Sequence, residues 1–136
     1  FSKIKCDYFS NTYPLTDKTY PDGTDIEIFK LKSLVKAYSM IKNKSDKEHV
    51  TTFFWKKKNI FKCKIYKSSK DLSDFRFCID YKDDLILMKK IVKYLKKKNL
   101  FGDAAHITNF IKKNKKLTDI SEKNKIKVIK YRKDLY

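Results

Sequence analysis

The ten residues YPDGTDIEIF (20–29) decide how the first half of this chain folds. They open on a turn, because proline presets φ, aspartate hydrogen-bonds to the backbone and glycine accepts a positive φ. Polar and apolar residues then alternate, which predicts a strand over residues 25–30 with Asp25 and Glu27 on one face and two isoleucines on the other. Two carboxylates on one strand face could hold hydroxyl groups or a cation. An ordinary strand with a solvated acidic face gives the same pattern, so the decapeptide alone leaves both interpretations open.

Working outward from this strand, the hydrophobic pattern predicts an α/β layered domain in which strands alternate with helices. Further strands are expected at 7–11, 60–66 and 75–79, the last as a buried central strand, with a final strand or strap around Ile126, Val128 and Ile129. Helices are expected at 31–43, 45–58, 81–98 and 103–113, the last capped by Asp103. The helix over 31–43 should bury Leu31, Leu34, Val35, Tyr38 and Ile41, and the helix over 81–98 should bury Leu85, Met88, Ile91, Val92 and Leu95.

Composition is compatible with a single domain-sized core. The chain has 136 residues, of which 41% are hydrophobic, while two glycines and two prolines leave no room for a flexible linker. No apolar run of about 18 residues is present, so we expect no membrane span. Three cysteines without a Cys-x-x-Cys pair argue against a zinc site or a disulfide framework and favour reduced thiols in the cytoplasm.

The net charge of +18 suggests nucleic-acid binding, but the residue types argue against it. Only Arg76 and Arg132 are arginines among 34 basic residues, and arginine is the side chain that best reads bases and grips phosphates. The lysines are scattered along the chain and accompany many Ile, Asn, Phe and Tyr residues, as an A/T-rich genome would produce. A basic module for nucleic acid or another polyanion remains the alternative interpretation.

Two places could carry chemistry besides the acidic strand. Asp80 lies where the expected buried strand ends and a long helix begins, a position at which a carboxylate can bind Mg²⁺. It could equally cap that helix, and we assign Asp83 and Asp84 to such a structural role. His49 lies at a helix start between an acid and a hydroxyl residue, while His106 fits only a structural role.

Taken together, these segments resemble the C-terminal half of the cytidylyltransferases that activate acidic sugars. The resemblance is to the branch of CMP-Kdo and acylneuraminate cytidylyltransferase-like proteins of spore-coat polysaccharide biosynthesis. It rests on four motifs at family spacing over roughly the first 100 residues. These motifs are Ser10-Asn11-Thr12, YPDGTDIEIF at 20–29, KEHVT at 47–51, and DLS-x-x-R-x-x-x-D-x-x-DD at 71–84.

The resemblance implies a three-layer αβα nucleotide-diphospho-sugar transferase fold, here its C-terminal half with a mixed sheet. It implies attack of a sugar hydroxyl on the α-phosphate of CTP with loss of pyrophosphate, in surface polysaccharide biosynthesis. Asp80 matches a Mg²⁺ ligand of the family, Asp25, Glu27 and His49 match the sugar pocket, and Arg76 matches a residue that supports the site. CTP and an acidic sugar are the implied partners, and a homodimer is compatible with the family. Residues 1–117 would form the cytidylyltransferase-like part and 118–136 a basic tail.

The chain also departs from the family pattern. Lys47 stands where arginine is usual, and the family's N-terminal half, with its nucleotide loop and first metal aspartate, has no counterpart in the sequence. The chain begins with Phe1, so we expect a processed chain or the later part of a longer protein, unable by itself to bind or turn over CTP. A degenerate remnant without activity is a third interpretation.

Overall fold

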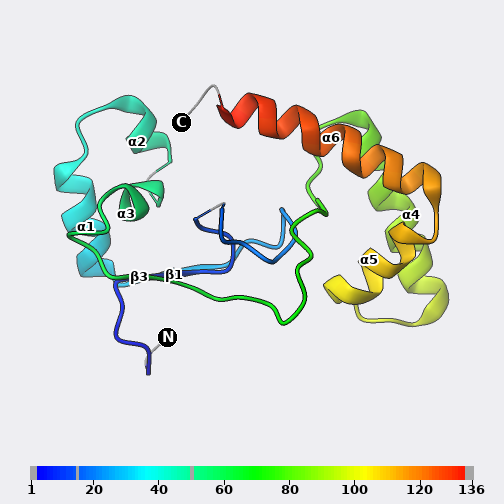
Figure 1. Cartoon of the computed structure of the whole chain (residues 1–136), viewed down its shortest axis with the longest axis horizontal. Coiled ribbons are helices and arrows are strands. Elements are labelled where there is room, and N and C mark those ends of the chain that lie inside the picture. Colours follow the sequence, from blue (N-terminus) through cyan, green and yellow to red (C-terminus); the bar gives the residue numbers. More distant parts are fainter. Residues whose placement is uncertain (1–2, 15, 50, 134–136) are drawn as a thin grey trace. The chain divides into compact units, whose positions relative to one another are not determined.

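The computed structural model describes residues 3–14, 16–49 and 51–133, with side chains described as far as residue 130. The chain divides into two compact units, each considered by itself below. Unit 1 comprises Phe1–Tyr20 and Asp25–Ser69, and unit 2 comprises Pro21–Thr24 and Lys70–Tyr136. The predicted α/β class is confirmed, because strands and helices both build the chain (Figure 1).

Unit 1 is organised around a mixed three-stranded sheet in the order β2-β1-β3. The central strand β1 (Tyr8–Ser10) pairs antiparallel with β2 (Glu27–Phe29) and parallel with β3 (Cys63–Ile65). The register places Tyr8 opposite Phe29 and Cys63, and Ser10 opposite Glu27 and Ile65. All three strands coincide with predicted ones but are shorter than predicted.

In β2 the apolar face is the exposed one, and the face that carries Glu27 is half-buried. Ile26 and Ile28 are 61% and 38% exposed, whereas Glu27 and Phe29 are half-buried. Phe29 packs against the core, and its neighbour two residues before, Glu27, must face the same side of the strand. The interpretation of Glu27 as part of a solvated acidic face is therefore wrong.

Three helices complete unit 1: α1 (Leu31–Met40), α2 (Lys44–Glu48) and α3 (Thr52–Lys56). The helix expected over 45–58 is thus two short helices, the first capped by Asn43, whose side chain accepts a hydrogen bond from the Asp46 N–H at 2.7 Å. Helix α3 supplies Phe53 and Phe54 to the core, which also contains Tyr8, Ala37, Ile41 and Phe61.

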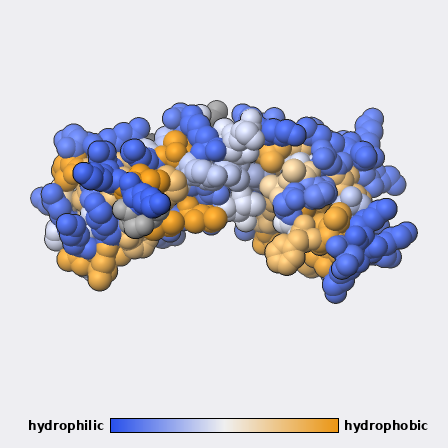
Figure 2. Space-filling view, turned by 90° about the horizontal axis from the view of Figure 1, so that it is seen from below, coloured by the Kyte–Doolittle hydropathy of each residue, from blue (hydrophilic) through white to orange (hydrophobic). Residues whose placement is uncertain are grey.

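Helix α1 buries only part of the face predicted for it: Ile41 belongs to the core and Leu34 packs against it, as expected. The buried residues of α1 are Ser33 and Ala37, while Leu31, Val35 and Tyr38 are 73%, 61% and 62% exposed. Ser33 donates a hydrogen bond to Asp7 Oδ1 at 2.9 Å, and Ala37 belongs to the core. Figure 2 shows that hydrophobic surface lies among hydrophilic side chains on the face drawn.

Unit 2 is a helical unit built from α4 (Lys82–Lys98), α5 (Ala104–Lys112) and α6 (Lys115–Lys133). Leu87, Ile91, Ile111 and Leu117 form its core. Asp103 caps α5 as predicted, since its carboxylate accepts a hydrogen bond from the His106 N–H at 2.7 Å. None of the described helices is long and apolar enough to cross a membrane.

Two predictions about unit 2 are wrong. Residues 75–79 form no strand, because Arg76 makes only an isolated parallel bridge to Asp22 and a turn offers no ladder to extend. The segment around Ile126, expected as a final strand or strap, is instead part of helix α6.

Candidate functional site

The buried guanidinium of Arg76 is the centre of a charged cluster in unit 2. Arg76 is only 3% exposed. Its Nη1 lies 2.8 Å from Asp84 Oδ2, its Nη2 donates to Asp80 Oδ2, and its Nε lies 3.8 Å from Asp22 Oδ2. One guanidinium therefore faces three carboxylates, and the cluster keeps an excess of negative charge. Burial acts to lower the pKa of Arg76, but Asp84 and the other neighbours outweigh it and hold the pKa above its ordinary value.

A tight turn brings Asp22 into this cluster. The Asp22 N–H donates to the Phe75 carbonyl at 3.1 Å, and the Phe77 N–H donates to the Asp22 carbonyl at 2.7 Å. Gly23 has φ +90°, and a Cβ there would lie 2.8 Å from both the Cys78 Sγ and the Phe77 carbonyl carbon. The positive φ predicted for this glycine is confirmed, and the close approach gives a second reason for glycine.

Asp84 is the structural member of the cluster. Its Oδ2 accepts hydrogen bonds from the N–H groups of Asp80 and Tyr81 at 2.9 Å, and its Oδ1 accepts from Asn124 Nδ2 at 2.7 Å. Burial acts to raise the pKa of Asp84, but these donors and Arg76 outweigh it, so the pKa lies below its ordinary value. The capping role assigned to Asp84 is confirmed, with Tyr81 as the N-cap of α4.

Asp80 is the member of the cluster that faces solvent. Its side chain is 61% exposed, and Arg76 holds it through Oδ2 alone. Among the described residues nothing donates a hydrogen bond to Oδ1. An exposed carboxylate oxygen on an oriented side chain fits the chemistry of Mg²⁺, which takes one or two acidic ligands and fills its other positions with water and phosphate. No cluster of three or more His, Cys, Asp or Glu side chains suited to a metal occurs in the described part of the chain. Further ligands would have to come from water, from substrate or from residues outside this sequence.

The predicted sugar-pocket residues lie in unit 1. Glu27 on β2 accepts a hydrogen bond from the Tyr8 hydroxyl at 2.7 Å, and Tyr8 is fully buried. Burial, followed by the hydrogen bond to Glu27 and then by its charge, raises the pKa of Tyr8 well above its usual range, so the hydroxyl stays a donor. Asp25 is exposed and lies just before β2. The N–H of the next residue, Ile26, donates a hydrogen bond to Asn11 Oδ1 at 2.7 Å.

His49 is half-buried at the C-terminal end of α2. Its N–H donates to the Ser45 carbonyl at 3.0 Å, and its own carbonyl accepts from the Thr52 hydroxyl at 2.7 Å. These bonds fix the backbone of His49 between two short helices. The structure thus brings Arg76 and Asp80 together in one unit and places Asp25, Glu27 and His49 in the other. Their binding roles remain predictions.

Sequence reasoning missed Asp22, Tyr8 and Asn124. Asp22 lies in the YPDGTDIEIF motif, where the local pattern indicates only a turn residue. Tyr8 and Asn124 carry no local signal, because each contacts its partner across 19 and 40 residues of sequence.

No protein-family model and no curated protein matches the chain. A solved structure does match it, a cytidylyltransferase from Leptospira borgpetersenii serovar Hardjo-bovis (strain JB197), with a TM-score of 0.70 and 25% sequence identity. The match covers 85% of this chain but 47% of that one, so the chain spans about half the length of its neighbour. The mixed-sheet α/β architecture is therefore similar to part of a cytidylyltransferase fold.

Proposed function

We propose that this chain is the sugar-side part of a cytidylyltransferase that transfers CMP from CTP to an acidic sugar in surface polysaccharide biosynthesis. The structural similarity to a cytidylyltransferase over most of this chain supports the cytidylyltransferase part of the proposal. The acidic sugar and the pathway rest on the resemblance of the motifs at 20–29, 47–51 and 71–84. The residues that bind CTP would lie outside this sequence, because its two glycines, Gly23 and Gly102, cannot build a glycine-rich phosphate loop.

In the proposed reaction a sugar hydroxyl oxygen attacks the α-phosphorus of CTP. A new P–O bond forms, the bond to the bridging oxygen breaks, pyrophosphate leaves with the electron pair, and the hydroxyl proton passes to water. When bound at Asp80, Mg²⁺ would neutralise charge on the phosphates. Arg76 would orient the Asp80 carboxylate and would not itself touch substrate, because its guanidinium is enclosed by carboxylates.

On the sugar side, Asp25, Glu27 and His49 would accept or donate hydrogen bonds to sugar hydroxyls. The Tyr8 hydroxyl holds Glu27 Oε1, which would orient the second carboxylate oxygen of Glu27 toward a ligand. Such positioning is the main contribution a protein makes to a displacement without a covalent enzyme intermediate.

The test uses the chain extended by the coding sequence upstream of Phe1. Replacing Glu27 with Gln or His49 with Gln should raise KM for the acidic sugar about tenfold or more, with KM for CTP unchanged. Glu48→Gln, at the exposed neighbour of His49, is the matched control and should leave both constants unchanged. Equal effects on the two substrates would contradict the assignment of these residues to the sugar.

A further inference from the structure

We propose that a groove along α4 is a docking site for an acidic amphipathic helix of a protein partner. The groove has a volume of about 490 Å³, and its lining residues all belong to unit 2: Ile79, Leu85, Met88, Lys89, Val92, Lys93 and Lys96. This inference concerns a different surface from the Arg76 cluster and does not depend on the proposed function.

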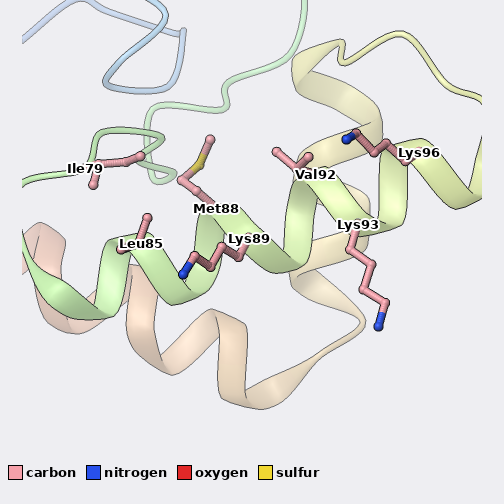
Figure 3. Close-up of a pocket in the computed structure, with 7 residues that line it drawn as sticks. All are labelled: Ile79, Leu85, Met88, Lys89, Val92, Lys93 and Lys96. Carbon is pink, nitrogen blue, oxygen red and sulfur yellow. The ribbon is translucent and has the colours of Figure 1, made fainter.

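The floor of the groove is apolar and solvent-accessible. Ile79, Leu85 and Val92 are 55%, 43% and 45% exposed, although the last two were predicted to be buried. From α4 the core takes Leu87 and, as predicted, Ile91, and the half-buried Met88 packs against the same core. Figure 3 shows Leu85, Met88 and Val92 along α4, with Ile79 reaching toward them from the preceding segment.

The spacing on α4 is that of a helix-packing seam. Leu85, Met88 and Val92 follow one another at intervals of three and four residues, the pattern of the a and d positions in a coiled coil. With Leu85 and Val92 as a positions, Lys89 and Lys96 lie four residues further along, at e positions beside the seam. Charged residues at such positions select the charge of the facing helix.

Charge determines which occupant fits. Lys89, Lys93 and Lys96 border the groove, no carboxylate lines it, and none of these ammonium groups pairs with a carboxylate of the described residues. A second copy of this chain would bring the same lysines into opposition on a protein of net charge +18. A membrane surface is flat and would not fill a groove. A small-molecule ligand would lack a buried polar group in the lining to orient it. An amphipathic helix with acidic flanks fits both the apolar floor and the cationic rim.

The probe is a designed helical peptide of about 20 residues with Leu at a and d positions and Glu at the flanking positions. Fluorescence anisotropy measures its binding to the full 136-residue chain. Two matched peptides serve as controls, one with Lys in place of Glu and one with the acidic sequence scrambled. We expect binding of the acidic amphipathic peptide alone.

Variants locate the binding. Val92→Asp, within the groove, should weaken binding at least about tenfold, whereas Ile86→Asp, on the same helix outside the groove, should not. The double variant Lys89→Glu, Lys93→Glu should also weaken binding, and Lys90→Glu, outside the groove, is its control. These variants test the charged rim of the groove independently of its apolar floor. Equal binding of the scrambled peptide, or no difference between Val92→Asp and Ile86→Asp, would overturn the proposal. Val92-dependent binding to anionic phospholipid vesicles or Val92-dependent self-association, in place of peptide binding, would also overturn it.

Discussion

The buried carboxylate of Asp84 contacts three separate parts of unit 2. It caps α4 through two backbone N–H groups, pairs with Arg76 and accepts a hydrogen bond from Asn124 on α6. Because Arg76 also holds Asp80, the packing of α6 is linked to the orientation of the candidate metal ligand. The motif that resembles the cytidylyltransferases identified Arg76 and Asp80, but only the structure reveals the carboxylates of Asp22 and Asp84 around the guanidinium.

Replacing Asp84 should destabilise the chain strongly. Asp84→Asn leaves the Arg76 charge buried with one partner fewer, and the loss of one member of a buried pair costs about 3–5 kcal/mol. Asp83→Asn is the control, since Asp83 pairs with Lys123 at 3.0 Å on the surface and should change stability by less than about 0.5 kcal/mol. Urea denaturation measures both variants, and equal stabilities would contradict the role given to Asp84.

Acid should weaken the fold through the same group. The pKa of folded Asp84 lies below its ordinary value of 3.8, so the unfolded chain binds more protons just below that pH. The stabilising contribution is complete above pH 3.8 and is lost as pH falls from there through the folded pKa. Asp7 and Asp46, whose pKa values are also lowered, act in the same direction. The free energy of unfolding measured from pH 6 to about 2 should therefore fall below pH 4, and less steeply in Asp84→Asn.

At the scale of elements, the sequence predicts correctly those features that depend on neighbouring residues, such as strand alternation, a helix cap and the bounds of a helix. The alternation at Phe61, Cys63 and Ile65, the cap at Asp103 and the extent of α4 all follow from neighbouring residues, and all are present. The conformation of residues 117–133 depends on distant contacts. Asn124 reaches Asp84 and Leu117 joins the core of unit 2, so the lysine-rich tail is a packed helix. Which apolar face of α1 or α4 is buried likewise depends on what packs against it.

Helix packing in unit 2 should depend on Ile111, which is fully buried between the other core residues. Ile111→Ala should cost about 2–5 kcal/mol, because it removes buried apolar surface and leaves a cavity. Ile86→Ala on the 51% exposed face of α4 should cost much less. Thermal unfolding followed by circular dichroism compares the two, and a similar loss in both would show that the core is assigned wrongly.

At the scale of the molecule, the charge of +18 is spread over many exposed lysines. We expect weak binding to DNA or heparin without sequence preference, with affinity that falls steeply as salt rises because counterions are released. Filter binding between 50 and 200 mM salt measures the slope. Tight binding of one nucleic-acid sequence at the higher salt would instead favour the alternative function of a basic nucleic-acid module.

The central claim is that this chain is the sugar-side part of a cytidylyltransferase with a metal-binding carboxylate at Asp80. The most direct measurement is pyrophosphate release from CTP and an acidic sugar by the chain extended with its upstream coding sequence, with and without Mg²⁺. We predict CTP-dependent release that requires Mg²⁺ and falls at least about a hundredfold in Asp80→Asn but remains in Asp83→Asn. No release from the extended chain, or release unchanged by Asp80→Asn, would contradict the account.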